Sequence, residues 1–121
     1  MTRRILIVED REDNRQILRD LLASTDYEIV EAENGVEALA AVAKQRPDLI
    51  LMDIQLPVMD GYEATRRIKA DPALRSIPII AVTSYALSGD EEKAREAGCD
   101  AYVPKPYSPR QLLAKIREFL P

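Results

Sequence analysis

Five polar side chains in this 121-residue sequence each come directly after, or close after, a short apolar run. They are Glu9, Asp10, Asp53, Thr83 and Lys105. None of these residues is by itself specific to a functional site, because acids that follow a strand often cap a helix or face solvent. Ligands of an open α/β sheet, however, bind at the carboxyl ends of its strands. If the apolar runs are parallel strands, all five side chains therefore meet at one edge of one sheet.

The residue types in this group predict a phosphoryl receptor. Glu9, Asp10 and Asp53 would repel one another, by about 4 kcal/mol per pair at about 4 Å and an effective dielectric near 20. A divalent cation removes that repulsion, and ligands that are all oxygen favour Mg²⁺. Lys105 adds a positive charge and Thr83 adds a hydroxyl donor. One carboxylate could then act as a nucleophile and hold a phosphoryl group as a mixed anhydride.

Strands and helices must alternate along the chain to place these groups. Four apolar runs are too short for helices and lack polar alternation, which predicts strands covered on both faces, as in a parallel sheet. These runs are residues 5–8, 49–52, 79–82 and 101–103. Residues 27–32 interleave apolar positions with Glu28 and Glu31, which predicts an edge strand with one wetter side.

Apolar residues at helical spacing lie between these strands. The first helix carries Ile17, Leu18, Leu21 and Leu22 on one face, with Asp13 as its expected N-cap and Gln16 at the capping-box position. Further helices are expected near residues 35–45, 61–70, 88–97 and 109–119, the last capped by Ser108, with Pro109 in its first turn. Gly98 follows the fourth helix, where a left-handed residue is expected. The fold class is therefore α/β: a single (βα)5 domain over residues 1–121, with a doubly wound parallel five-stranded sheet and right-handed crossovers.

Composition excludes several classes of function. With 17 Lys+Arg and 21 Asp+Glu the net charge is −4, which argues against a nucleic-acid surface. The sequence has no histidine and one cysteine, so histidine catalysis and a disulfide framework are excluded and structural zinc is improbable. We expect Cys99 to be a small buried hydrophobe. No apolar run could span a membrane and no signal peptide is evident, so a reducing cytoplasm is expected.

Longer stretches of sequence resemble one family. The chain is similar to the CheY-like receiver domains of bacterial two-component response regulators. The matching stretches are Ile7–Asp10, Asp48–Asp53, Leu56–Gly61, Ala81–Ser84, Ala97–Tyr102 and Lys105-Pro106. They span essentially the whole chain in the family's order and spacing. The resemblance implies a flavodoxin-like sheet in the order 2-1-3-4-5. Within the family the chain is most similar to the single-domain cell-cycle regulators.

The resemblance also implies a role for each site residue. Asp53 would be the phosphoacceptor. Asp10 would bind Mg²⁺ directly, Glu9 through water and Gln55 through its backbone carbonyl. Thr83 and Lys105 would contact phosphoryl oxygens, and Tyr102 would be the switch aromatic. The Lys105-Pro106 peptide is expected to be cis, as a prolyl bond permits. Gln55 and Tyr85 would flank the path of the hydrolytic water. Neither is a base at neutral pH, which predicts a long-lived phosphoryl group.

Partners follow from the same resemblance. The donor would be a histidine kinase or a histidine phosphotransfer protein. Phosphorylation would change the surface of the fourth helix, fifth strand and fifth helix, which a downstream protein would read. We expect a monomer or weak homodimer with no nucleic-acid or membrane partner. The protein would assist its own phosphorylation and dephosphorylation without being an enzyme in the usual sense.

Other functions remain as alternatives. An aspartate-nucleophile phosphatase would need a second acid two residues after Asp53, where Gln55 stands. A flavin-binding electron carrier of the same sheet order would need a phosphate loop in place of the acidic segment 9–13. A degenerate receiver that binds partners without phosphorylation is a further alternative, although the complete set of acids with Thr83 and Lys105 argues against it. Receivers taken from hybrid kinases share much of the same pattern.

Overall fold

Five parallel strands form one sheet in the computed structural model, which describes residues 2–83 and 90–121. The strands lie in the order β2-β1-β3-β4-β5, so the expected fold class and strand order are confirmed. Their bounds are β1 Arg4–Val8, β2 Glu28–Ala32, β3 Leu49–Asp53, β4 Ile79–Thr83 and β5 Ala101–Pro104. The strand order reverses beside β1, so the crevice between the carboxyl ends of β1 and β3 is the expected ligand position for this topology.

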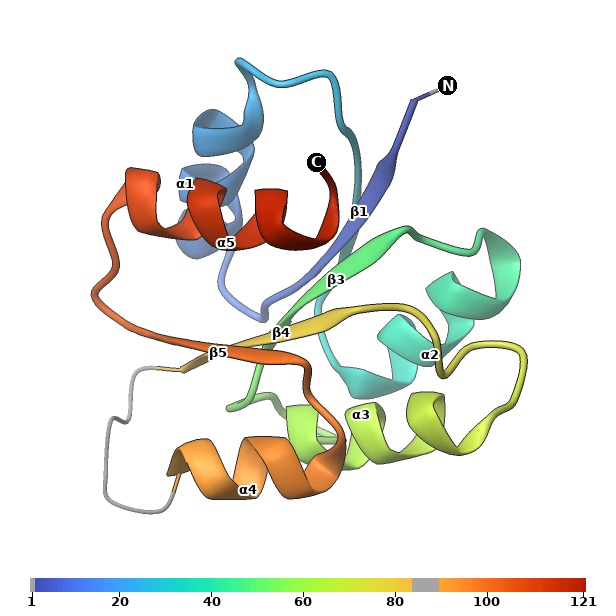
Figure 1. The fold of residues 1–121 in the computed structure, drawn as a ribbon. Helices are drawn as coiled ribbons and strands as arrows, with labels where there is room; N and C mark the ends of the chain where they lie inside the picture. The colour runs from blue at the N-terminus through green and yellow to red at the C-terminus, as the bar shows by residue number, and fades with distance from the viewer. Residues whose placement is uncertain (1, 84–89) are drawn as a thin grey trace.

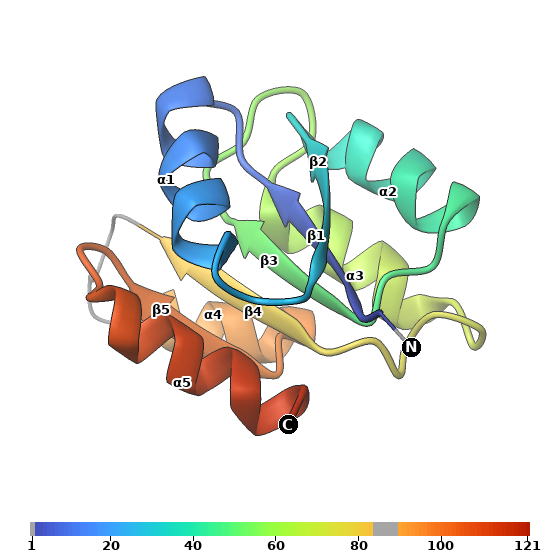
Figure 2. The ribbon, with the colours of Figure 1, turned by 90° about the horizontal axis from the view of Figure 1, so that it is seen from above.

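Helices cover both faces of the sheet. Their bounds are α1 Glu12–Leu22, α2 Gly35–Lys44, α3 Gly61–Ala70, α4 Asp90–Ala97 and α5 Pro109–Phe119. In Figure 1, α1 and α5 lie above the sheet and α2, α3 and α4 lie below it, and Figure 2 shows the same two layers from above. None of the helices in the described ranges is long and apolar enough to cross a bilayer.

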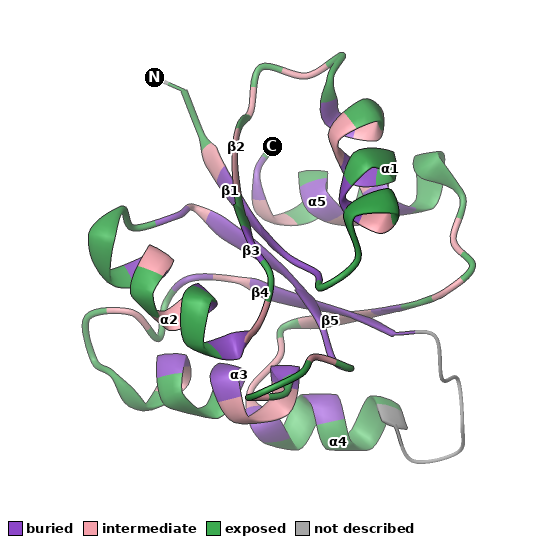
Figure 3. Cartoon of the chain, turned by 180° about the vertical axis from the view of Figure 1, so that it is seen from behind, coloured by how far each residue is buried: buried purple, intermediate pink, exposed green. Residues whose placement is uncertain are grey.

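The core has two halves because alternate residues of each strand point to opposite faces. Ile5, Ile7 and Leu51 pack with residues of α1 and α5, whereas Leu6 and Ile50 pack with residues of α2, α3 and α4. Strands β3 and β4 are buried along their whole length. Figure 3 accordingly shows a buried sheet between helices whose outer sides are exposed. This double coverage is why these strands read as continuous apolar runs in the sequence.

Helix ends agree with the sequence at α5 but differ at α1. Ser108 and Gln111 form a capping box at α5, and Gly98 has a φ of 108° after α4. Asp13, in contrast, lies inside α1, and Arg11 stands at the N-cap, where its side chain makes no capping hydrogen bond. The prediction of Asp13 as the cap is therefore wrong. An acid in the first helical turn is favourable without capping because it faces the positive end of the helix dipole.

The loop from β3 to α3 is held close to the end of the sheet. The N–H of Gly61 donates to the carbonyl oxygen of Ile54 (3.0 Å), and a Cβ on Gly61 would lie 2.8 Å from the Ile54 Cα. Asp60 caps α3 by accepting from the N–H of Glu63 (2.9 Å). Val58, in the same loop, has a φ of 68° and is 84% exposed. The loop that follows Asp53 is thus tightly anchored and contains one left-handed valine.

Candidate functional site

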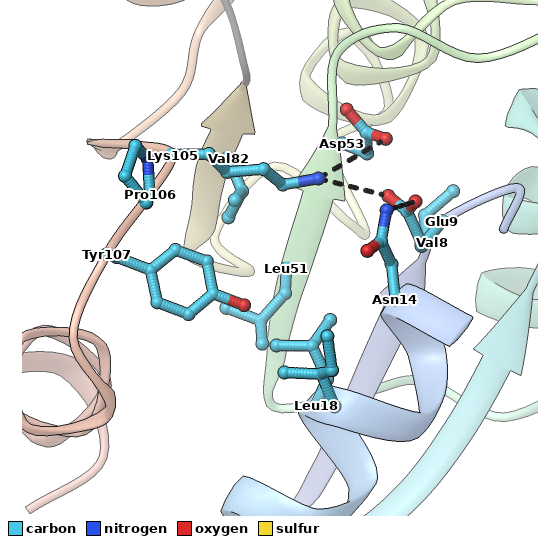
Figure 4. Close-up of a pocket in the computed structure, with 11 residues that line it drawn as sticks. Val8, Glu9, Asn14, Leu18, Leu51, Asp53, Val82, Lys105, Pro106 and Tyr107 are labelled. Atoms are coloured by element: carbon cyan, nitrogen blue, oxygen red, sulfur yellow. Dashed lines mark hydrogen bonds and ion pairs between the residues drawn. The ribbon is translucent and has the colours of Figure 1, made fainter. Parts of the chain in front are cut away.

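The polar side chains that follow the strands lie together at the carboxyl edge of the sheet. Glu9 follows β1, Asp53 ends β3, Thr83 ends β4 and Lys105 follows β5. Glu9, Asp53 and Thr83 are buried, with exposed fractions of 2, 7 and 2%. Figure 4 shows Glu9, Asp53 and Lys105 reaching this edge from three separate segments of the chain. Only the parallel topology brings these distant residues into one site.

Three carboxylates form the acidic part of the site. One oxygen each from Glu9, Asp10 and Asp53 lies within 4.8 Å of the other two. Glu9 and Asp53 are buried, whereas Asp10 is exposed. The group therefore has two enclosed carboxylates and one that faces water.

Lys105 supplies the counter-charge. Its Nζ lies 3.5 Å from Oε2 of Glu9 and 3.9 Å from Oδ2 of Asp53, as the dashed lines in Figure 4 mark. The N–H of Lys105 donates to the carbonyl oxygen of Thr83 (2.7 Å), which fixes the start of the loop after β5. The Lys105-Pro106 peptide is cis, as the sequence predicts. The ammonium is thus held between the two buried carboxylates.

The two buried carboxylates have very different proton affinities. The pKa of Asp53 is raised to about 8, first by burial and then by the hydrogen bond and negative charge of Glu9. The charge of Lys105 and the hydrogen bond from the Gln55 N–H lower this pKa but do not offset the rise. Burial also acts to raise the pKa of Glu9, but hydrogen bonds with Asp53 and Asn14 and the charge of Lys105 outweigh it and hold this pKa below its ordinary value. Burial and the neighbouring charge of Glu9 therefore both favour the protonated form of Asp53 as long as no metal ion lies beside it.

Gln55 contacts Asp53 through its backbone. Its N–H donates to Oδ1 of Asp53 (3.1 Å), which holds one carboxylate oxygen and leaves Oδ2 toward Lys105. The side chain of Gln55 is exposed. Tyr85, the other residue expected beside the hydrolytic path, lies outside the described residues.

Two residues of α1 belong to this site although sequence reasoning missed them. Nδ2 of Asn14 donates to Oε1 of Glu9 (2.7 Å), and Nη1 of Arg15 donates to the carbonyl oxygen of Glu9 (2.9 Å). The only signal for them in the sequence was their distance of five and six residues after Glu9. On a helix that starts at Glu12, this spacing turns both side chains back toward the end of β1.

The donor set fits magnesium. Mg²⁺ is bound by one or two carboxylates, keeps several waters and completes its octahedron with carbonyl or phosphate oxygens. Three carboxylates with one exposed member offer such a set. Two buried carboxylates this close repel each other, which a bound cation would relieve, and the same repulsion contributes to the raised pKa of Asp53. When bound, the metal would neutralise a phosphoryl group and supply a Lewis acid beside Asp53.

Thr83 and Tyr102 lie on adjacent strands. In the β4–β5 register Thr83 is paired with Pro104 and Ala81 with Tyr102, so Thr83 and Tyr102 share one face of the sheet. Tyr102 is half-buried against the core between the sheet and α2, α3 and α4. Thr83 is two residues after Ala81, the partner of Tyr102 on the adjacent strand, so a displacement of the Thr83 side chain occurs close to Tyr102.

A cavity of about 440 Å³ opens beside Lys105 on the side of the sheet covered by α1 and α5. Its walls include Ile17 and Leu18 of α1, and Pro106 and Tyr107 of the loop before α5, as Figure 4 shows for the labelled residues. Ile17 is 55% exposed. The approach to the carboxylates from this side is therefore apolar.

Cys99 lies far from this edge and is no reactive thiolate. Its Sγ lies 3.8 Å from the hydroxyl of Thr65, and burial raises the pKa of the thiol to about 11. The residue is partly rather than fully buried.

Comparison with known proteins defines the class of this site. Residues 5–117 match the response regulator receiver domain family, and the chain belongs to that family. The family consists of phosphoacceptor signalling proteins of two-component systems, which interact with histidine kinases and downstream effectors.

Relatives include both separate regulators and domains of kinases. The chain is 48% identical over 120 residues to the polar-differentiation response regulator DivK of Brucella anthropi. The aligned residues cover 99% of this chain and 98% of that relative. Among solved structures, the receiver domain of a sensor histidine kinase from Pseudomonas aeruginosa, with a magnesium ion coordinated in its active-site cleft, is 38% identical. It has a TM-score of 0.91 and covers 99% of this chain and 98% of that one. A chemotaxis response regulator of Vibrio cholerae is 28% identical, with a TM-score of 0.91 and coverage of 98 and 99%.

Proposed function

We propose that residues 1–121 act as one receiver domain in which Asp53 accepts a phosphoryl group from a phosphohistidine in the presence of Mg²⁺. The observation that carries the proposal is the group of three carboxylate oxygens within 4.8 Å, with Lys105 beside two of them. Asp10 would bind the metal directly, Glu9 through water, and Gln55 through its carbonyl oxygen. The magnesium ion in the active-site cleft of the Pseudomonas receiver supports a metal at this place in the fold.

The transfer itself is a displacement at phosphorus. An oxygen of Asp53 forms the new O–P bond as the N–P bond of the phosphohistidine breaks, and the imidazole leaves with the bonding pair and takes a proton from water. Lys105, now 3.9 Å from Oδ2 of Asp53, would pair with a phosphoryl oxygen. Thr83 would donate its hydroxyl to another. These fixed donors stabilise charge on the moving group, which is the main contribution that a protein makes to phosphoryl transfer.

The phosphodonor protein would approach across the apolar mouth between α1 and the loop before α5. Exposed Ile17 and the neighbouring Pro106 and Tyr107 offer a contact surface directly beside Asp53. A histidine kinase or a histidine phosphotransfer protein would present its histidine there. The location implied for such a partner is the cytoplasm.

The output would lie on the surface formed by α4, β5 and α5. Phosphorylation adds nearly two negative charges and would draw the hydroxyl of Thr83 toward the phosphoryl group. Tyr102, on the same sheet face, would turn inward and change the surface of α4, β5 and α5. A downstream protein, or a second copy in a weak dimer, would read that surface. Amide shifts confined to the surroundings of Asp53 after phosphorylation, with no change in residues 90–110, would contradict this switch.

Incubation with acetyl phosphate and Mg²⁺ followed by intact mass spectrometry tests the proposal. We expect one phosphoryl group per chain, stable in acid and labile in base, and none when EDTA removes the metal. Asp53→Asn should abolish uptake, whereas Asp26→Asn, an exposed acid before β2, should take up the group normally. Normal uptake by Asp53→Asn would show that the acceptor is assigned to the wrong residue.

The lifetime of the phosphoryl group depends on the residues beside the hydrolytic path. Gln55 and Tyr85 offer no base at neutral pH, so the aspartyl phosphate should decay slowly without a partner. Tyr85→Glu and Tyr85→Ala should both speed decay on the purified protein with excess Mg²⁺. Unchanged or slower decay in both variants would refute the shielding role while leaving Asp53 as the acceptor.

A further inference from the structure

Arg15 of α1 is a buried cation that contacts the backbone of Glu9 rather than its carboxylate. Its side chain is 10% exposed, and Nη1 donates to the carbonyl oxygen of Glu9 (2.9 Å). Burial of a guanidinium is costly unless its donors are satisfied. A buried arginine directly behind a metal-binding turn therefore needs an explanation.

Each of the three nitrogens of the Arg15 guanidinium lies close to an oxygen acceptor. Besides the Glu9 carbonyl, Nη2 lies 2.7 Å from Oε2 of Glu12 and 3.4 Å from Oε1 of Glu33, and Nε lies 3.2 Å from Oε1 of Glu31. Glu12 belongs to α1, Glu31 to β2, and Glu33 follows β2. Arg15 thus joins the turn after β1 to the neighbouring strand and to the first turn of α1.

These contacts leave Glu9 little freedom. Its N–H donates to the carbonyl oxygen of Ala32 (3.0 Å), its own carbonyl accepts from Arg15, and its Oε1 accepts from Asn14 (2.7 Å). Asp10 is the next residue along the chain, so the direction of the Glu9 carbonyl sets where the Asp10 carboxylate starts. Both carboxylates therefore depend on one peptide unit that Arg15 holds.

We infer that Arg15 is a positioning residue for the divalent cation, which fixes Glu9 and Asp10 in register with Asp53. The inference rests on the proposed function. The positive charge of Arg15 and its hydrogen bond to Glu9 have opposite effects on the affinity for Mg²⁺. As a nearby cation, Arg15 repels Mg²⁺, so a purely electrostatic role predicts that its removal strengthens metal binding. As the group that holds the Glu9 carbonyl, it predicts that its removal weakens metal binding.

Arg19 provides a matched control on the same helix. It contacts Glu12 and Glu31, two of the acids that Arg15 contacts, and its recorded hydrogen bonds do not include the backbone of Glu9. Arg15→Met and Arg19→Met each remove one positive charge and keep an apolar stem. The two variants therefore share the loss of contacts to Glu12 and Glu31. They differ in the hydrogen bond to the Glu9 carbonyl, which only Arg15 makes, and in the deeper burial of Arg15 and its contact with Glu33.

Titration of each folded variant with MgCl2, followed by amide chemical shifts, tests the inference without any phosphorylation. We expect Arg15→Met to raise the dissociation constant for Mg²⁺ about 10-fold, which is the low end of the range for groups that orient metal ligands. Arg19→Met should leave it unchanged or lower it slightly. Arg15→Lys keeps the charge and one donor but loses the planar fork, so its affinity should fall between those of wild type and Arg15→Met.

The outcomes separate the inference from the proposed function. Binding by Arg15→Met as tight as that by Arg19→Met overturns the positioning role while the metal site stands. Should Arg15→Met fail to fold, an Arg15→Lys variant that binds Mg²⁺ as tightly as wild type overturns it equally. A wild-type chain whose amides near Glu9 and Asp53 do not respond to Mg²⁺ overturns the metal site and the inference together.

Discussion

Replacement of Val58 by glycine should make the protein more stable. Val58 is a β-branched residue with a φ of 68°, a conformation that costs an L-residue about 1–2 kcal/mol. Its side chain is 84% exposed, so truncation removes little buried apolar surface. Glycine removes this strain, but it also lowers the free energy of unfolding by about 0.4–1 kcal/mol because it increases the conformational entropy of the unfolded chain. The difference between these two ranges is about 0–1.6 kcal/mol, and we expect a gain near its middle, about 0.5–1 kcal/mol, in the free energy of unfolding.

Thermal and urea unfolding measure this gain. An unfolding entropy of about 2.1 cal/mol/K per residue corresponds to roughly 0.25 kcal/mol/K for 121 residues, so Tm should rise by about 2–4 °C. The urea midpoint should rise with an unchanged m-value.

Val36 is the matched control for this prediction. It is 49% exposed but lies in the first turn of α2, where the backbone is helical. Val36→Gly should therefore lower the stability, by up to about 1 kcal/mol. The same substitution thus has opposite signs at the two valines. A Val58→Gly variant that is no more stable than wild type would refute the strain that we assign to this residue.

Three further predictions concern other parts of the fold. Gly61→Ala should destabilise the protein by about 1–3 kcal/mol in urea unfolding, because the added Cβ would press on the backbone at Ile54 and Asp53; an unchanged midpoint would show that the loop yields easily. Lys69→Met should cost about 1–3 kcal/mol, because Nζ donates within 2.9 Å to the carbonyl oxygens of Arg75 and Ile77 and to the Asp100 carboxylate, and all three would lose this donor; stability equal to that of wild type would contradict it. Cys99 should react with iodoacetamide at pH 8 much more slowly in the folded than in the urea-unfolded chain, since burial raises its pKa to about 11. The raised pKa also means that the contribution of this thiol to stability is complete below pH 9 and is lost as pH rises toward 11. Equal alkylation rates in the two states would count against it.

The helices and strands of this protein, and the polar residues at the strand ends, could be predicted from the sequence because their signals are local. A strand covered on both faces must be apolar throughout, which marks residues 49–52 and 79–82. Ser108 directly before Pro109 marks the start of α5 within two residues, and the structure adds Gln111 as the second member of a capping box. The polar groups at the strand ends stand out against these runs. The carboxyl ends of parallel strands lie at one edge of the sheet, so the sequence alone predicts that Glu9 and Asp53 lie close together.

Tertiary structure alone decided how those groups are held. The sequence suggests Asp13 as a helix cap, yet the chain enters α1 two residues earlier, and Asp13 pairs with Arg11 instead. Nothing near Arg15 in the sequence shows that it reaches the carbonyl of Glu9 and the acids of β2, because those contacts depend on how α1 packs beside a strand that comes later in the chain. Such contacts join residues whose approach is set by the packing of whole elements. A pattern within a few residues determines which element forms, but only the assembled sheet determines which side chains its ends bring together.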